Sequence, residues 1–311
     1  MQVFYAPDIS GEQYTLDKNE SKHIIRVLRM KKGTPVNLID GTGNLYEGVI
    51  SNPDPSGCII NIGSVTREFE KRNYRLHIAI SPLKNPERFE WFIEKAVEIG
   101  VDEITPLICR NTEKKGVKTE RIGNLIISAM KQSLKAFKPV LNEANDFEAF
   151  INKNHSGKLM IAHCYGELKR TRISDVYYKG EEAVILIGPE GDFSGQEVEK
   201  AMSKKFTQIH LGMSRLRTET AGVAACHSIY FINQEYLAGE EIQHITNHFR
   251  WYIVELSVLA VVAGNGSEPP VLDIEDLCQK TACSPDLTGG ACSGPTFGTN
   301  IFNWSVHHYL Y

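Results

Sequence analysis

Residues 185–225 constrain the fold of this chain more than any other stretch, because two similar units follow one another there. In each unit an apolar run typical of a strand ends in a glycine-bearing loop, and the loop leads into a sequence typical of a helix. The first loop begins at Gly188 and the second at Gly212. Strands, loops and helices in this order expose backbone amides to small ligands in α/β enzymes. Two such loops so close together predict one ligand pocket.

The same alternation of strands and helices extends back to residue 74. Ser194 and Glu197 have the spacing of a capping box, which sets the start of one helix. We therefore predict a mostly parallel sheet with helices on both faces. Apolar runs predict strands at residues 76–80, 103–108, 158–162, 183–187 and 207–211, and helical spacing predicts helices at residues 88–99, 121–135, 218–236 and from residue 194 onward.

Residues 1–72 have a different pattern, with short strands separated by turn signals. Gly41 and Gly43 lead into another strand instead of a helix, which argues against a dinucleotide-binding fingerprint at this turn. One helix interrupts the strands, with Asn19 as its candidate N-cap. The pattern predicts a small β-rich domain, with strands at residues 3–5, 34–39, 45–50 and 58–62 and the helix at residues 19–30.

A cationic strip lies on this N-terminal helix and just after it. No acidic residue occurs between Ser21 and Lys32. Clusters of this kind gain affinity for phosphate backbones by releasing counterions. A solvated helix face is the alternative interpretation, and the absence of acidic residues favours RNA. The cationic strip consists of Lys22, His23, Arg26, Arg29, Lys31 and Lys32.

The charge of the chain is divided unevenly between its body and its C-terminal part. Residues 239–311 carry two basic and eight acidic side chains, so the net charge of −4 leaves +2 for residues 1–238. No signal peptide and no apolar run long enough to span a bilayer is evident, which predicts a soluble, cytoplasmic protein that binds no membrane. Cysteines occur singly through the body and read as reduced thiols. His163 and Cys164 read as packing residues at the end of a strand.

The first glycine loop lacks the features of two common nucleotide sites. Residues 188–191 have neither the Lys-Ser/Thr ending of a phosphate-binding P-loop nor the glycine spacing of a Rossmann turn. This argues against nucleoside triphosphates and NAD. No cluster of His, Cys and carboxylate residues in the body has metal-ligand spacing, so no metal is predicted.

Four segments, in the same order, resemble the signature of a known family. Residues 188–191 and 211–221 look like the two central loops of the RsmE family, the 16S ribosomal RNA uridine-N3 methyltransferases of the SPOUT superfamily. Residues 23–29 are similar to that family's N-terminal His-x-x-x-Val-Leu-Arg segment, and residues 94–101 to its first methyltransferase helix. Asp192 departs from the pattern, because many members have a second glycine there. The resemblance covers about residues 1–237.

This resemblance implies an α/β protein with a PUA-like β-barrel at residues 1–72 and a SPOUT domain with a deep trefoil knot at residues 73–238. It also implies that the protein uses S-adenosylmethionine as methyl donor, acts on 16S rRNA in the small ribosomal subunit and forms a homodimer. The acidic, cysteine-bearing residues 239–311 lie beyond the resemblance. We predict that they form a poorly ordered extension, whose role stays unassigned, and that methyl transfer does not need it.

The position of the charged residues in the second loop, just before a helix start, suggests which of them act in the site. Arg217 is the candidate cation that stabilises the uridine anion, and Glu219 either orients Arg217 or takes the proton. In the alternative interpretation, these two residues form an ion pair that only shapes the turn. Lys131, Gln132 and Ser133 are weaker candidates for contact with RNA or a second subunit. The predicted cofactor-binding residues are Ile187, Gly188, Pro189, Glu190, Gly191, Leu211, Gly212, Ser214 and Leu216.

Two other functions remain open at the level of the sequence. The chain would be a non-catalytic RNA-binding or ribosome-assembly factor if it bound no S-adenosylmethionine. It would be a SPOUT methyltransferase with a different RNA target if the methylated nucleoside were found elsewhere.

Overall fold

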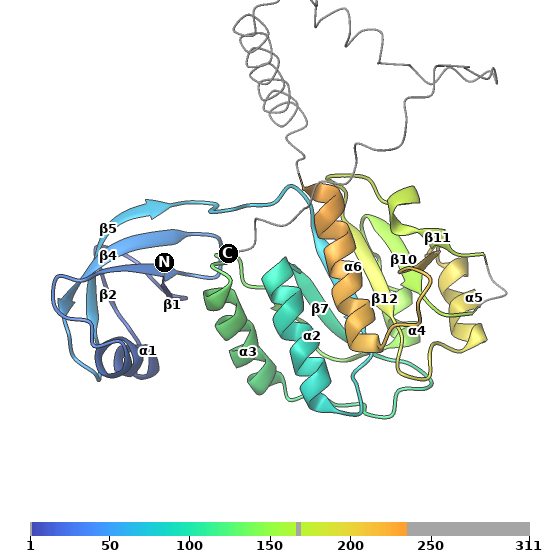
Figure 1. Ribbon diagram of the computed structural model, residues 1–311, viewed down its shortest axis with the longest axis horizontal. Helices are drawn as coiled ribbons and strands as arrows, with labels where there is room; N and C mark the ends of the chain where they lie inside the picture. The colour runs from blue at the N-terminus through green and yellow to red at the C-terminus, as the bar shows by residue number, and fades with distance from the viewer. Residues whose placement is uncertain (1, 166–168, 235–311) are drawn as a thin grey trace, which may run out of the picture. The chain divides into compact units, whose positions relative to one another are not determined.

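The computed structural model describes residues 2–165 and 169–234 (Figure 1). The extension predicted at residues 239–311 therefore lies outside the described residues. Among the described helices, none combines the length and the apolar character of a membrane span.

The N-terminal part forms a five-stranded sheet in the order β1-β3-β4-β5-β2. β1 and β3 are parallel, and the other neighbours are antiparallel. The predicted strand at residues 3–5 is confirmed, and the next three are shifted at their ends. β2 was missed because it is short and polar. The strands are β1 (Val3–Tyr5), β2 (Gln13–Thr15), β3 (Pro35–Ile39), β4 (Leu45–Asn52) and β5 (Ile59–Thr66).

The helix predicted at residues 19–30 is shorter and begins earlier. α1 (Lys18–Lys22) continues as a wider π-helical turn, His23–Val27. Asn19 is not the N-cap, because the Asp17 carboxylate accepts hydrogen bonds from the amides of Asn19 and Glu20 at 2.7 and 2.8 Å. The cationic strip therefore extends past the end of the helix into the following loop.

A second sheet of eight strands contains the order β11-β13-β10-β12-β6-β7-β8, with β9 also paired to β7. Every one of its strand pairs is parallel, which confirms the predicted sheet. The three two-residue strands were not predicted. The strands are β6 (Leu76–Ile80), β7 (Glu103–Ile108), β8 (Val140–Leu141), β9 (Asn145–Asp146), β10 (Lys158–Ala162), β11 (Thr171–Arg172), β12 (Ala183–Ile187) and β13 (Thr207–His210).

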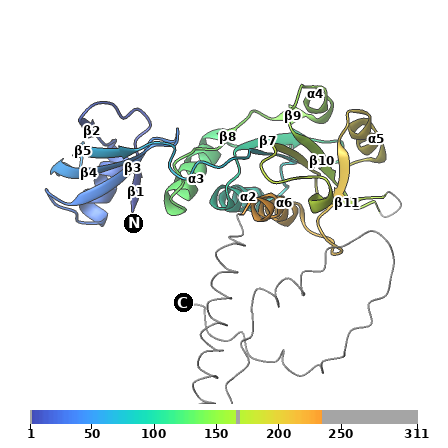
Figure 2. The same ribbon diagram turned by 90° about the horizontal axis from the view of Figure 1, so that it is seen from above.

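Helices cover both faces of this sheet, as predicted. Figure 2 shows α2 and α6 on one face and α4 and α5 on the other. α2 begins two residues earlier than predicted because the Asn85 side chain caps it, and Gly100 ends it in the left-handed conformation (φ 118°). The helices are α2 (Pro86–Ile99), α3 (Thr119–Gln132), α4 (Phe147–Ile151), α5 (Gly195–Ser203), α6 (Thr218–Asn233) and a 3₁₀ turn, Ile173–Asp175.

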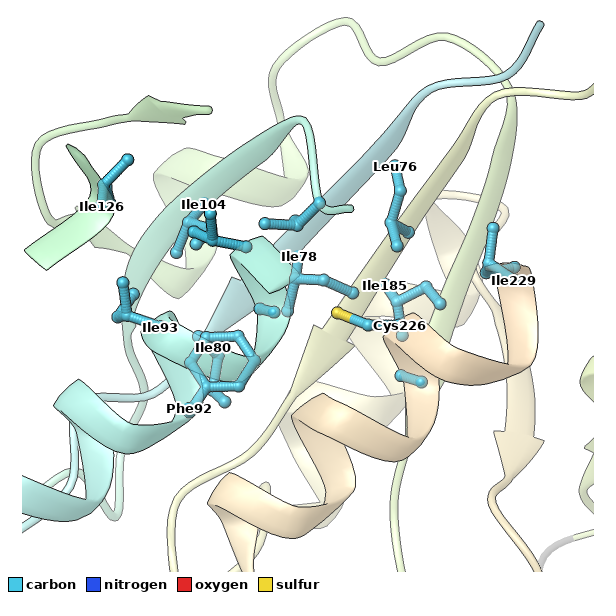
Figure 3. Packing of buried hydrophobic residues seen from close by; sticks show 14 of the residues in the cluster. Leu76, Ile78, Ile80, Phe92, Ile93, Ile104, Ile126, Ile185, Cys226 and Ile229 are labelled. Carbon is cyan, nitrogen blue, oxygen red and sulfur yellow. The ribbon is translucent and has the colours of Figure 1, made fainter. Parts of the chain in front are cut away.

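The apolar core lies between the central strands and α2 and α6. β6 and β12 are buried along their whole length, because helices pack on both of their faces. Figure 3 shows Ile80 and Ile185 of these strands against Phe92 of α2 and Cys226 of α6. This packing fixes the ends of the strands, from which the two glycine loops emerge.

The turn that holds Gly41 and Gly43 packs against the segment after α3. The Gly43 amide donates to the Ala136 carbonyl at 3.0 Å, and the Lys138 amide donates to the Gly41 carbonyl at 2.8 Å. Only glycine fits at residue 43, because an added Cβ would lie 2.2 Å from the Phe137 ring. The glycine at residue 43 is thus explained by close packing.

Lys131 also makes an internal contact. Its ammonium group pairs with the largely buried Glu20 carboxylate of α1. The sequence had assigned Lys131 to RNA or a second subunit, and this ion pair gives its charge another partner.

Candidate functional site

The two glycine loops meet at the carboxyl ends of the strands and line a cavity of about 390 Å³, here called cavity I. One wall is the loop after β12 and the other is the segment that leads into α6. Arg88 of α2 and Ala162 at the end of β10 complete it. Of the predicted residues, Ile187, Gly188, Pro189, Glu190, Leu216, Arg217 and Glu219 line cavity I.

A second cavity of about 550 Å³, cavity II, adjoins the first and shares Cys164, Asp192 and Arg215 with it. Gly191, Gly212 and Ser214, also predicted to bind the cofactor, line cavity II. Leu211 does not lie in either cavity. It lines a third, cavity III, against α6. The single pocket expected from the sequence is therefore a pair of adjoining cavities.

Asp192 ties the first glycine loop to the end of β10. Its backbone is left-handed (φ 62°), a conformation that glycine favours and that aspartate tolerates better than most residues. Its Oδ1 accepts a hydrogen bond from the Phe193 amide and its Oδ2 one from the Cys164 amide, both at 2.8 Å. The substitution for a second glycine thus adds a link between two walls of the site.

Glu197 of α5 and Asn111, which follows β7, both brace the same loop. The predicted capping box is present, with the Ser194 amide donating to Glu197 Oε2 at 2.7 Å. The other oxygen of Glu197 accepts from the Arg110 amide at 2.8 Å. Asn111 donates from Nδ2 to the carbonyl groups of Gly191 and Asp192 at 3.2 and 3.1 Å. The first glycine loop is therefore held on two sides.

Arg217 and Glu219 do not form the ion pair that the sequence left open. Within the described residues, the exposed Arg217 side chain makes no hydrogen bond and no ion pair. Glu219 is only 7% exposed, and its Oε1 lies 3.8 Å from Nε of Arg88. Its Oε2 is buried without a hydrogen-bond partner. Glu219 therefore does not orient Arg217 by direct contact.

The two residues at the end of β10 differ in their surroundings. His163 is buried, and one ring nitrogen lies 2.9 Å from Oε1 of Gln208. Burial lowers the pKa of His163, which keeps its ring neutral near pH 7. Cys164 is exposed and lines cavities I and II, so its interpretation as a packing residue is wrong.

All six side chains of the cationic strip are exposed. None of them forms an ion pair within the part of the chain that the structure describes. Across the same residues, no group of three or more His, Cys, Asp or Glu side chains is arranged to hold a metal ion.

Two family models match the chain. The model described as "RNA methyltransferase domain" matches residues 70–230, and the one described as "RNA methyltransferase PUA domain" matches residues 16–63. A curated relative, ribosomal RNA small subunit methyltransferase E of Rickettsia conorii, is 28% identical over 208 residues. This match covers 65% of the present chain and 83% of the relative.

Solved structures are also similar to this chain. A probable rRNA-methyltransferase from Porphyromonas gingivalis is 41% identical, with a TM-score of 0.71 over 75% of this chain and 98% of its own. A methyltransferase structure from Legionella pneumophila, solved in complex with the bound cofactor SAM, is 26% identical. Its TM-score is 0.68, over 74% of this chain and 97% of its own.

Proposed function

Because the chain belongs to the RsmE family of RNA methyltransferases, we propose that it methylates N3 of a uridine in 16S rRNA on the assembled small ribosomal subunit. The methyl donor is S-adenosylmethionine. The observation that carries the proposal is the match of the RNA methyltransferase model to the residues that build both cavities. The names of the curated relatives support the small subunit as substrate.

The chemistry of cavities I and II suits this donor, which supplies a methyl group bound to a positively charged sulfur. Both cavities fall within the range of about 300–1,000 Å³ usual for ligand pockets. Ile187 and Leu216 offer apolar surface for an adenine ring, and the carboxylates of Glu190 and Asp192 complement the charges of the sulfonium and ammonium groups. The predicted cofactor-binding residues that line cavities I and II are the ones we propose to hold it.

Methylation of N3 requires a lone pair on a nitrogen that carries a proton in neutral uridine. We assign the proton to Glu219, since this carboxylate makes no contact with Arg217 and one of its oxygens has no partner. The electron pair of the broken N–H bond stays on N3 and forms the bond to the methyl carbon. The pair of the broken carbon–sulfur bond stays on sulfur. Arg217, whose guanidinium is unpaired within the described residues, stabilises the uridine anion.

The remaining parts of the proposal concern the assembly. Residues 1–72 form the RNA-binding domain, whose cationic strip attracts the rRNA, and residues 73–238 form the methyltransferase domain. The deep trefoil knot, the homodimer and the cytoplasmic location follow from the family resemblance. Light scattering of the purified chain tests the homodimer.

The test of the proposed function uses the purified full-length protein with tritiated S-adenosylmethionine. The acceptors are small ribosomal subunits and deproteinised 16S rRNA, both from a strain that lacks the corresponding gene. We expect label in the subunits, at N3 of uridine by mass analysis of nucleosides. Label at another nucleoside supports a different RNA target, and label in neither substrate contradicts an enzyme. If calorimetry detects no binding of S-adenosylmethionine, the result supports a non-catalytic factor.

A further inference from the structure

Arg88 lines cavity I although nothing in its sequence surroundings marks it as functional. It lies in the first turn of α2, just after the Asn85 cap. Its side chain is 44% exposed, and its Nε lies 3.8 Å from Oε1 of Glu219 in the first turn of α6. The two helix starts therefore bring a cation and a carboxylate together at one wall of the cavity.

Glu219 needs such a counter-charge because of its burial. A carboxylate removed from water is destabilised unless hydrogen bonds or an opposite charge compensate it. Arg88 forms the one ion pair that Glu219 makes within the described residues, while Oε2 has no partner. Arg215 and Arg217 also line cavity I, yet neither pairs with Glu219 in this part of the chain. One oxygen thus faces Arg88, and the other is buried without a partner.

The positions of the two helices are fixed by close packing. Gly222, one turn after Glu219, lies against Phe92, one turn after Arg88, so closely that an added Cβ would be 2.5 Å from the ring. Only the side chains are therefore free to adjust. The last torsion of a glutamate is broad, so its carboxylate turns without a movement of the backbone.

We propose that Arg88 is a positioning residue for methyl transfer. Its guanidinium holds the Glu219 carboxylate in one orientation, so that Oε2 accepts the proton from N3 of the target uridine. The inference rests on the proposed function, because it names the residue that prepares the proposed proton acceptor. Arg88 itself touches neither the reacting nitrogen nor the methyl group.

The experiment compares the wild type with Arg88→Gln and Arg88→Lys. The matched control is Arg121→Gln, because Arg121 of α3 also pairs with a glutamate of its neighbour α2, Glu90, at 2.7 Å, but does not line cavity I. For Arg88→Gln we expect kcat to fall by about 10- to 100-fold, as for a weakened general base, with KM for the subunit and Kd for S-adenosylmethionine within about threefold. Arg88→Lys should recover most of kcat, and Arg121→Gln should match the wild type.

A double-mutant cycle with Glu219→Gln separates an action through Glu219 from a direct one. Adding Arg88→Gln to Glu219→Gln should cause little further loss of kcat. Wild-type kcat in Arg88→Gln, or an equal loss on both backgrounds, overturns the proposal. Urea unfolding of the wild type, the two single variants and the double variant gives a second cycle. The changes in unfolding free energy must be non-additive if the two side chains are paired. This second cycle tests the pairing even if the wild type methylates no rRNA, an outcome that would reject the proposed function alone.

Discussion

Among the individual residues of cavity I, Arg217 is a cation whose side chain is available to contact a substrate. It precedes α6 directly, is exposed and has no side-chain partner within the described residues. A fixed positive charge close to a developing anion stabilises the transition state more in a cavity that is partly shielded from water than it would in bulk solvent.

We predict that Arg217→Ala lowers kcat by about 10²- to 10³-fold, as when one stabilising donor is lost from an active site. Kd for S-adenosylmethionine, measured by calorimetry, should stay within about threefold of wild type because the proposed cofactor contacts remain. Lys179→Ala, which removes another exposed cation outside the two cavities, is the control. Retained methyl transfer would remove Arg217 from the mechanism.

His77 gives a prediction about pH. It is buried in β6, with a ring nitrogen 2.8 Å from Oγ1 of Thr105. Burial lowers the pKa of His77 to about 4, and His155, Arg75 and Lys153 act in the same direction, while Glu103 opposes them. In the unfolded chain the pKa is 6.5, so the unfolded state binds more protons below that pH. The contribution of His77 to stability is therefore complete above pH 6.5 and decreases as the pH falls toward 4.

When the pH is lowered from 6.5 to 4, we predict that the unfolding free energy of His77→Gln decreases less than that of the wild type. The difference should be on the order of 1–3 kcal/mol, measured by urea unfolding at a series of pH values. Parallel curves for wild type and His77→Gln would contradict the lowered pKa.

At the scale of secondary-structure elements, the sequence predicted the buried strands well and the short ones poorly. β6, β7, β10 and β12 have the predicted bounds, because a run of apolar residues between turn signals marks a strand buried on both faces. β8, β9 and β11 have two residues each and depend on pairing with a neighbouring strand. Such pairing has no local signal. α1 was misplaced because Asp17, not Asn19, supplies the capping oxygen.

The contact between α2 and α6 gives a prediction at this scale. Gly222→Ala should lower the unfolding free energy by about 1–3 kcal/mol, since the new methyl group would overlap Phe92 and force a shift in a packed core. In Gly123→Ala the methyl group meets no atom within 4 Å, so this change inside α3 should stabilise the protein by about 0.5–1 kcal/mol. Urea unfolding measures both, and equal effects would contradict the role of packing.

At the scale of the whole molecule, the proposed function needs RNA to be bound by residues that take no part in the chemistry. The cationic strip is exposed and free of ion pairs within the described residues, so its charges are available to phosphates. Affinity of this origin depends steeply on salt, because binding releases counterions.

We predict that the triple change Lys22→Gln, Arg26→Gln and Arg29→Gln weakens binding to 16S rRNA by at least about tenfold at low salt. The slope of log K against log salt concentration should also become less steep by about two units. This is close to the change expected when three phosphate contacts are lost. Filter binding over a range of salt concentrations measures both quantities. A control with Lys179, Lys204 and Lys205 changed to glutamine removes the same charge elsewhere. An unchanged slope in the first variant would contradict the proposed role of the cationic strip in RNA binding.

The sequence by itself determined the parallel sheet, the two glycine loops and the candidates Arg217 and Glu219, because each depends on residues close together in the chain. Only the tertiary structure decided how these parts combine. The amide of Arg110 and the carboxylate of Glu197 are 87 residues apart, and Arg88 and Glu219 belong to different helices. Contacts of this kind arise when strands and helices pack into one core, and they leave no periodic or local signal in the sequence. The same packing divided the one expected pocket into two cavities and gave Glu219 a partner other than Arg217.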